Sequence, residues 1–285
     1  METNNSGPVE CLKDYVGDIS SISKDMQEKT HSCDGPWFRG MDDMNYDILP
    51  GAYWRKGVEE WAVVTEFKSQ APSYIRQELH PQLSGAIDDP WEWYFLVQHY
   101  GLPTRLLDWT ENPLAALYFA VEKDESSKKN PCVWVLNPNR LNKAALEDPN
   151  IIVPGGKFSQ HWLCQESEDS SEGCKPGESR SFTYEDKDFT NKHPIAIYPI
   201  RKNPRIIAQQ GVFTIHGTET IGMKEFLERQ AGVELGEILK CIEIEPNCVR
   251  KLRTELSYFG VHQLSLFPEL PNLAEHIKSR LQIKP

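Results

Sequence analysis

The stretch that decides the fold covers residues 98–120 and reads QHYGLPTRLLDWTENPLAALYFA. Gly101 is typical of a helix end, because glycine readily adopts the left-handed conformation found there. Apolar and charged residues are interspersed over the short segment 104–109, which predicts a strand. Asn112 and Pro113 then begin a second helix, since a capping asparagine followed by proline is a common helix start. The stretch therefore predicts a helix, a strand and a helix in succession.

The rest of the chain predicts further helices and strands around this stretch. Helices are expected at residues 9–29, 58–79, 90–100, 140–147, 224–230, 248–260 and 273–281, and strands at 36–40, 132–136, 195–200, 205–215 and 239–244. Asp89 and Pro90 begin one of these helices as cap and first residue. Because helices and strands mix without strict alternation, the sequence predicts an α+β fold, with mixed central sheets and flanking helices.

Three regions are expected along the chain. They are an N-terminal helix within residues 1–30, a main domain over 31–270 and a C-terminal helix within 271–285. Residues 165–190 are acidic and rich in serine, with few apolar side chains. Such a segment buries too little apolar surface to order itself. We therefore expect a flexible insertion at the surface of the main domain.

Charge and cysteine content argue against several classes of function. The net charge is −11 and no basic stripe is present, so nonspecific binding to nucleic acid is not expected. No apolar run approaches the roughly 20 residues of a membrane-spanning helix. The N-terminus lacks the features of an export signal, which favours the cytoplasm. The seven cysteines form no C-x-x-C pair, so no metal site is expected. A local anion pocket stays possible, because net charge does not determine the charge of a pocket.

Arg39 and Gly40 end an apolar strand and form the first candidate for a ligand site. A guanidinium can bind a phosphate or a carboxylate through two parallel hydrogen bonds. The glycine beside it leaves room for a ligand to approach the backbone. The alternative is that Arg39 forms only a surface salt bridge where the strand ends.

The strand at residues 104–109 forms the second candidate, because its side chains alternate between two faces. Thr104, Leu106, Asp108 and Thr110 share one face, and Arg105, Leu107 and Trp109 share the other. The polar groups lie just before a helix N-terminus, whose free N–H groups favour an anion or an amide. Alternatively, Thr110 only caps that helix and Asp108 only anchors the turn. His99 suits the end of the preceding helix in either case.

Gln209 and Gln210 form the third candidate, within the strand expected at residues 205–215. A glutamine side chain both donates and accepts hydrogen bonds, but it cannot act as a base at neutral pH. Gly211 follows them, and a glycine inside a strand commonly marks a bulge or a close approach by other atoms. The alternative is that the paired glutamines are a feature of an edge strand.

Together these segments resemble the FRG domain, a family named for a Phe-Arg-Gly motif, which here is Phe38-Arg39-Gly40. The second signature is the stretch at residues 98–120, and residues 205–214 and 256–270 also resemble family segments. The resemblance covers roughly residues 37–270. It implies a bacterial or phage-related protein that acts in phage defence or as a toxin.

The order of these motifs is also similar to that of the ADP-ribosyltransferase fold. In that fold an arginine ending the first strand holds NAD, a second strand carries serine or threonine before a helix, and a third strand carries a catalytic glutamate. Arg39 with Gly40 resembles the first motif, Asp108-Trp109-Thr110 the second, and Gln209, or alternatively Gln210, the third. A neutral glutamine can hold a ribose hydroxyl, but it loses the electrostatic stabilisation that is usually the largest catalytic term.

The resemblance implies that the site binds NAD and cleaves its nicotinamide–ribose bond. ADP-ribose then passes to a macromolecule, such as a protein acceptor, or to water. In this interpretation Arg39 holds the pyrophosphate, Thr110 and Gln209 position the ribose, Asp108 or His99 supplies charge, and Tyr100 or Trp109 stacks on the nicotinamide. The remaining residues expected around the ligand are Gly40, Thr104, Arg105 and Gln210. The alternative is a non-catalytic sensor module that recognises a nucleotide or a phage-derived partner in the same pocket.

Overall fold

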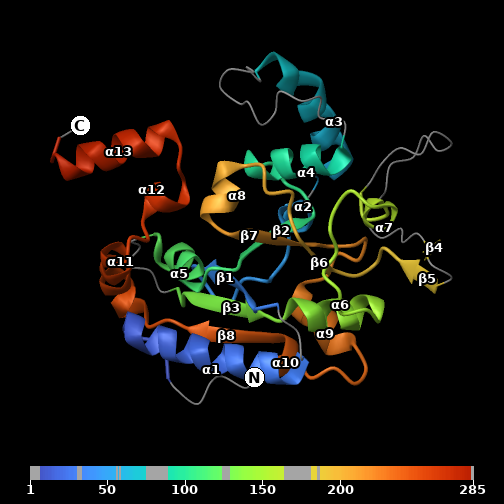
Figure 1. The fold of residues 1–285 in the computed structure, drawn as a ribbon, viewed down its shortest axis with the longest axis horizontal. Coiled ribbons are helices and arrows are strands. Elements are labelled where there is room, and N and C mark those ends of the chain that lie inside the picture. Colours follow the sequence, from blue (N-terminus) through green and yellow to red (C-terminus); the bar gives the residue numbers. More distant parts are fainter. Residues whose placement is uncertain are drawn as a thin grey trace.

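The computed structural model shows a six-stranded sheet with helices on both faces (Figure 1). It describes residues 7–30, 34–55, 57, 59–74, 89–123, 129–163, 181–184 and 187–283. The order of the strands is β6-β7-β2-β1-β3-β8, and every pairing is antiparallel. The strands are β1 (Trp37–Met41), β2 (Leu106–Thr110), β3 (Cys132–Leu136), β6 (Ile195–Ile197), β7 (Gly211–Ile215) and β8 (Leu239–Glu243). The prediction of an α+β fold is confirmed.

Most of the described helices lie against the sheet, and short 3-10 turns accompany them. The longer helices are α1 (Leu12–Thr30), α3 (Glu60–Gln70), α4 (Pro90–His99), α5 (Pro113–Val121), α6 (Pro138–Leu146), α11 (Val249–Tyr258) and α13 (Leu270–Arg280). The shorter ones are α2 (Gly51–Trp54), α7 (Lys157–Gln160), α8 (Pro204–Ala208), α9 (Met223–Arg229), α10 (Leu235–Ile238) and α12 (Gln263–Leu266), with turns η1 (Ala71–Ser73) and η3 (Pro246–Cys248). None of the helices among the described residues is long and apolar enough to cross a membrane.

Three clusters of buried apolar side chains hold the layers together. One face of β1, β3 and β8 packs under α1, α5 and α11, with Phe38 and Val135 near its centre. The same face of β2, β7 and β6 packs under α4, through residues such as Phe95 and Phe213. The opposite face of the sheet packs against α6, α9 and α10, where Trp37 is buried. One face of the sheet is therefore divided between two helix groups, and the division lies between β1 and β2.

Local capping fixes the helices that flank β2, as the sequence predicts. The carboxylate of Asp89 accepts a hydrogen bond from the amide of Trp91 at the start of α4. The amide oxygen of Asn112 accepts hydrogen bonds from the amides of Leu114 and Ala115 at the start of α5. Each cap satisfies amide groups that have no partner within the helix.

Gly40 serves helix packing, which differs from the expected role of making room for a ligand. A Cβ at this position would lie 1.9 Å from the carbonyl oxygen of Ala116 and 2.6 Å from the amide nitrogen of Ala120. Both atoms belong to the backbone of α5. The glycine therefore lets α5 lie directly on β1, and the atoms that approach closely are those of the helix.

The strand expected at residues 205–215 is wrong in its first half. Residues Pro204–Ala208 form helix α8, and only Gly211–Ile215 form strand β7. Asn203 caps the helix with its side chain, and Pro204 occupies the first turn, where its fixed φ is favourable. Gln210 has a φ of 48°, in the left-handed region that ends the helix. Gln209 and Gln210 therefore lie in the turn between α8 and β7.

The acidic stretch at residues 165–190 ends in an ordered pair of strands. Residues 165–180 and 185–186 lie outside the described residues, but β4 (Ser181–Tyr184) pairs with β5 (Lys187–Thr190). The rings of Phe182 and Phe189 pack edge-on against that of Phe158, with centroids 5.5 Å and 5.1 Å away. Two aromatic side chains therefore attach these eight residues to the body of the protein. The expected flexibility of the insertion stays a prediction.

Candidate functional site

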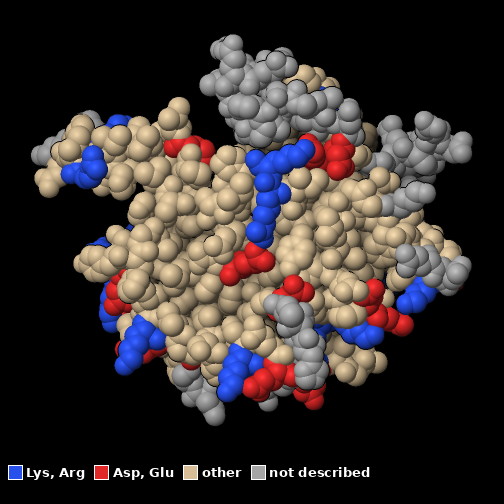
Figure 2. Space-filling model, in the orientation of Figure 1, with Lys and Arg blue, Asp and Glu red and all other residues tan. Residues whose placement is uncertain are grey.

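The candidate site lies where β1 and β2 separate. The two strands pair only between Phe38 and Thr110, although each continues beyond that point. A cleft of about 1330 Å³ opens there. Figure 2 shows basic side chains at the centre of the drawn face with acidic side chains next to them, and further charged side chains along its lower rim. Of the residues predicted from the sequence, those that line the cleft are Arg39, Gly40, His99, Tyr100, Asp108, Trp109, Thr110 and Gln209.

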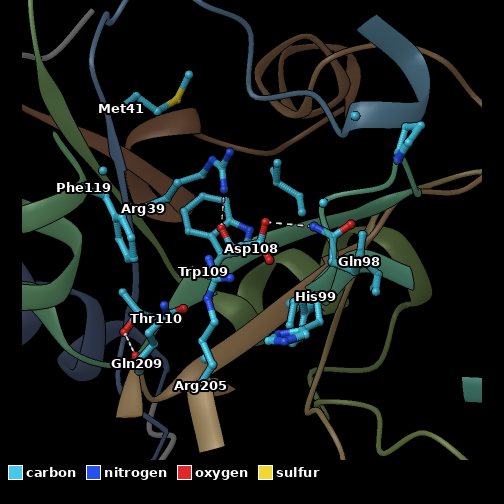
Figure 3. Close-up of a pocket in the computed structure, with 18 of the residues that line it drawn as sticks. Arg39, Met41, Gln98, His99, Asp108, Trp109, Thr110, Phe119, Arg205 and Gln209 are labelled. Atoms are coloured by element: carbon cyan, nitrogen blue, oxygen red, sulfur yellow. Dashed lines mark hydrogen bonds between the residues drawn. The ribbon is translucent and has the colours of Figure 1, made fainter. Parts of the chain in front are cut away.

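Arg39 bridges the point of separation. Its Nη1 atom donates to the backbone carbonyl of Asp108 at 2.6 Å (Figure 3). The Nε atom is buried and has no hydrogen-bond partner among the described residues. Burial lowers the pKa of Arg39, and the negative charge of Asp108 opposes that effect. A buried donor without a partner costs about 1–3 kcal/mol, and only an acceptor that reaches the Nε atom itself would recover that free energy.

Asp108 presents an exposed carboxylate to the cleft. Its Oδ2 atom accepts from Nε2 of Gln98 at 2.9 Å, and Oε1 of Gln98 accepts from the hydroxyl of Thr104 at 2.5 Å. Because Thr104 is fully buried, it fixes the amide of Gln98, which in turn orients the carboxylate. Gln98 was not among the predicted site residues. The sequence feature that could have identified Gln98 is its position as the first residue of the stretch 98–120.

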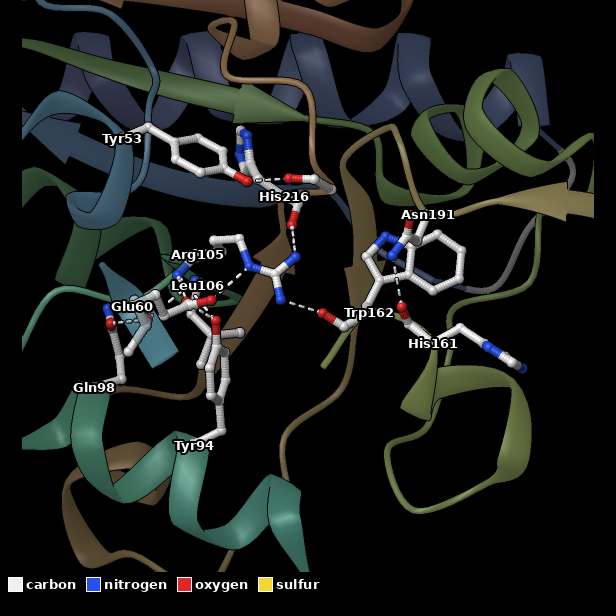
Figure 4. Close-up of polar contacts among 12 residues, drawn as sticks. Tyr53, Glu60, Tyr94, Gln98, Arg105, Leu106, His161, Trp162, Asn191 and His216 are labelled. Atoms are coloured by element: carbon white, nitrogen blue, oxygen red, sulfur yellow. Dashed lines mark hydrogen bonds and ion pairs between the residues drawn. The ribbon is translucent and has the colours of Figure 1, made fainter. Parts of the chain in front are cut away.

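Thr104 and Arg105 do not line the cleft, so their predicted contact with the ligand is wrong. The side chain of Arg105 is only 4% exposed, and its Nε atom lies 2.7 Å from the Glu60 carboxylate. Its other two nitrogens donate to the carbonyls of Trp162 and His216 (Figure 4). Arg105 therefore joins α3, the chain after α7 and the end of β7. The sequence could not show this, because the three partners are distant along the chain.

Gln210 is also outside the cleft. Its side chain is exposed, and its backbone carbonyl accepts a hydrogen bond from the amide of Glu111. Gln209 lies at the rim instead, where its Nε2 atom donates to the carbonyl of Leu266 at 3.0 Å. Of the two alternatives for the third motif, the structure brings only Gln209 to the site.

The hydroxyl of Thr110 already makes hydrogen bonds within the protein, and these compete with hydrogen bonds to a ribose. Its hydroxyl donates to the carbonyl of Gln209 at 2.6 Å and accepts from the amide of Asn112 at 2.9 Å. A hydroxyl has one proton and two lone pairs, so its only proton is already used. Thr110 therefore joins the turn after α8 to the start of α5.

The aromatic residues differ in what they offer a ligand. Trp109 is 3% exposed, and its Nε1 atom donates to the hydroxyl of Thr214 at 3.1 Å. Tyr100 is 52% exposed, and its ring stands edge-on to that of His99, with centroids 5.0 Å apart. The Tyr100 ring also lies beside that of Phe67, with centroids 5.9 Å apart. Of the two aromatic residues, Tyr100 is the more exposed to a ligand in the cleft.

The cleft also has charged lining residues that the sequence did not point to, and Arg205 and Glu269 are two of them. Arg205 projects from α8 toward β2 (Figure 3), and its guanidinium carbon lies 4.4 Å from the centroid of the Phe267 ring. Glu269 follows from the C-terminal segment and lines the same cleft. Arg205 stands at the start of a segment that resembles the FRG domain, but nothing in the sequence placed it beside β2. No group of three or more potential metal ligands occurs among the residues that the structure describes.

The fold and the cleft define an α+β protein with an open site between two splayed strands of one sheet. The family model of the FRG domain matches residues 35–129, so the chain contains an FRG domain there. The match includes both signature segments of the cleft, whereas α8, β7 and the C-terminal segment lie beyond it. No curated protein and no solved structure matches the chain.

Proposed function

We propose that the cleft binds a dinucleotide of the NAD type and cleaves its nicotinamide–ribose bond. The observation that supports this most is the junction of Arg39 and Asp108 inside a cleft of about 1330 Å³. One residue supplies a cationic fork with a buried, unpaired Nε atom, and the other an exposed carboxylate. Phosphates and a developing ribosyl cation need these two kinds of group.

The charged residues divide the reaction between them. Arg39 and Arg205 hold the pyrophosphate, and Tyr100 stacks on the nicotinamide. The bond between the ribose C1′ and the nicotinamide nitrogen breaks, and its electron pair leaves with nicotinamide. Asp108 stabilises the positive charge that develops at C1′. A lone pair of a protein acceptor or of water then bonds to C1′, and the proton of the attacking group passes to Asp108 and on to solvent.

A second candidate is a binding module that recognises a nucleotide without consuming it. The observation that favours it is that Thr110 and Gln209 already donate hydrogen bonds within the protein. The proton of Thr110 and the amide of Gln209 are already bonded to backbone carbonyls. A glutamine also supplies no negative charge. Such a module would act as a sensor in phage defence or toxin control, the setting that the family resemblance suggests.

Consumption of NAD separates the two candidates. The test measures NAD loss and thermal shift with NAD, for the wild type, Arg39→Ala and Asp108→Asn. Arg201→Ala is the matched control, because Arg201 is exposed, pairs with Glu111 and does not line the cleft. Asp108→Asn keeps an acceptor for Gln98 while removing the charge.

Cleavage predicts NAD loss that falls by about 10²–10³ in Asp108→Asn, as when other groups that stabilise developing charge are removed. Arg39→Ala should weaken binding, and Arg201→Ala should behave as the wild type. A thermal shift that depends on Arg39 without NAD loss would select the binding module. No response of the wild type to NAD would contradict both.

A further inference from the structure

A second, smaller cavity adjoins the cleft. Its volume is about 420 Å³, and it lies between α4, the chain leading into α8 and residues 268–271. The residues that line both cavities are Phe95, His99, Tyr100, Arg205, Ile206 and Glu269. A ligand in the cleft could therefore extend into the smaller cavity past this common wall.

The interior of the smaller cavity is mainly apolar. Its apolar lining residues include Phe95, Leu96, Ile200 and Ile206, together with Leu270, which is 77% exposed. Its volume falls within the range of about 300–1,000 Å³ that small-molecule sites occupy. An aromatic side chain and branched aliphatic side chains of this kind suit a flat, largely apolar group such as a purine base.

The common wall carries one positive and one negative side chain. Arg205 belongs to α8, and Figure 3 shows it approaching β2 from the side opposite to Met41. Glu269 is half-buried, and its Oε2 atom accepts from Nδ2 of Asn272 at 2.9 Å. A carboxylate has about four acceptor positions, so Glu269 can accept further hydrogen bonds.

We propose that the smaller cavity is an adenosine subsite of the cleft. This inference rests on the proposed function. The adenine base enters the apolar cavity, the ribose hydroxyls donate to Glu269, and the adjacent phosphate contacts Arg205. An NAD molecule then runs from adenosine in the smaller cavity, past Arg205 and Arg39, to the nicotinamide ribose at Asp108.

Glu269 also sets a preference between two dinucleotides. A carboxylate accepts hydrogen bonds from the 2′-hydroxyl and 3′-hydroxyl of a ribose, as acidic residues do in other NAD sites. A phosphate on the 2′-oxygen removes one donor and brings a like charge next to Glu269. NAD is therefore preferred to NADP.

Binding of nucleotide fragments tests the subsite separately from the cleft. Isothermal titration uses AMP, nicotinamide mononucleotide, NAD and NADP with the wild type, Ile200→Trp and Glu269→Gln. Ile200→Trp fills the smaller cavity, because Ile200 lines that cavity and not the cleft. Ile207→Trp is the matched control, since Ile207 is 54% exposed and lines neither cavity. Glu269→Gln removes the negative charge while keeping nearly the same side-chain volume. It therefore still tests the subsite if Ile200→Trp does not fold.

The expected result is a loss of at least about tenfold in the affinity of Ile200→Trp for AMP and NAD, since a filled pocket excludes its occupant. Its affinity for nicotinamide mononucleotide should stay within about twofold, and Ile207→Trp should match the wild type. Glu269→Gln should weaken AMP binding and reduce the preference for NAD over NADP.

Unchanged AMP and NAD affinities in Ile200→Trp and in Glu269→Gln would overturn the subsite and leave the proposed function standing. Ile200→Trp that binds NAD normally but no longer modifies a protein acceptor would assign the cavity to an apolar side chain of that acceptor. If the wild type binds none of the four nucleotides, the proposed function fails, and the subsite fails with it.

Discussion

Arg39 donates from Nη1 to the backbone carbonyl of Asp108 at 2.6 Å, across the point where β1 and β2 separate. The side chain thus replaces a backbone pairing that the two strands no longer make. Arg39 thus joins the two strands and also presents a cation to the cleft. Asp108 accepts this bond with its backbone carbonyl, and its carboxylate lines the cleft.

We predict that Arg39→Lys weakens binding of NAD although the charge is kept. An ammonium cannot bond to the Asp108 carbonyl and to a phosphate with the planar fork of a guanidinium. We expect a loss of about tenfold in affinity and a decrease of about 2–4 °C in melting temperature, since one bridging hydrogen bond is worth about 1 kcal/mol. Titration calorimetry and thermal unfolding measure the two effects, with Arg201→Lys as control. An unchanged affinity would remove Arg39 from the phosphate site.

We predict that Gly40→Ala destabilises the protein by at least about 3 kcal/mol, because the new Cβ collides with backbone that cannot rotate away. That Cβ would lie 1.9 Å from the Ala116 carbonyl oxygen. The matched control is Gly17→Ala in α1, where nothing lies within 4 Å. The control should be more stable by about 0.5–1 kcal/mol, since alanine favours a helix. Urea denaturation measures both. Equal stability of Gly40→Ala and the wild type would contradict the close packing of α5 on β1.

The parts of the site that could be predicted are those encoded by neighbouring residues. The caps Asp89 and Asn112 work within two or three residues, and so the two helices around β2 follow from the sequence. Arg39 was placed beside Asp108 through resemblance, and the structure brings both to one cleft. Their chemical roles stay predictions.

The parts that could not be predicted depend on contacts between distant segments. The sequence places Arg105 among the ligand contacts. Its actual partner, Glu60, is 45 residues away in the sequence, so the ion pair between them could not be recognised there. The apolar run at Ile206 suggested a strand, although Asn203 and Pro204 start a helix there. The sequence leaves Tyr100 and Trp109 as alternatives for stacking on the nicotinamide. The alternation of side chains shows which face of the strand carries Trp109, but it does not show that another layer of the fold covers that face.

We predict that the pair formed by Arg105 and Glu60 shows strong coupling in a double-mutant cycle. The two side chains are 4% and 9% exposed, so removing one leaves the other charged and buried. Arg105→Met alone should destabilise the protein by about 3–5 kcal/mol, and adding Glu60→Leu should recover part of that loss. Chemical denaturation of the two single variants and the double variant measures the coupling. Simple additivity of the two losses would show that the carboxylate is not stabilised by Arg105.

We predict that His216 reduces the stability of the protein in acid. Its ring is buried, and neither ring nitrogen has a hydrogen-bond partner among the described residues. Burial, and then the charges of Arg105 and Arg39, lower the pKa of His216 to about 3. In the unfolded chain a histidine titrates near its usual pKa of about 6.5.

The sign follows from the two pKa values. Above pH 6.5 the ring is neutral in both states, so its pKa shift has no effect on stability. Between pH 6.5 and pH 3 the unfolded state binds a proton that the folded state does not, and stability falls as the pH falls, by up to about 1.4 kcal/mol per pH unit. His216→Phe removes this proton, and the ring of phenylalanine has no polar atom to bury. The unfolding free energy of His216→Phe should therefore decrease less steeply than that of the wild type from pH 6 to pH 4. The difference in unfolding free energy between the two proteins at pH 8 is the baseline. Parallel curves over this range would mean that His216 is protonated in the folded protein, and that its ring reaches water or an acceptor.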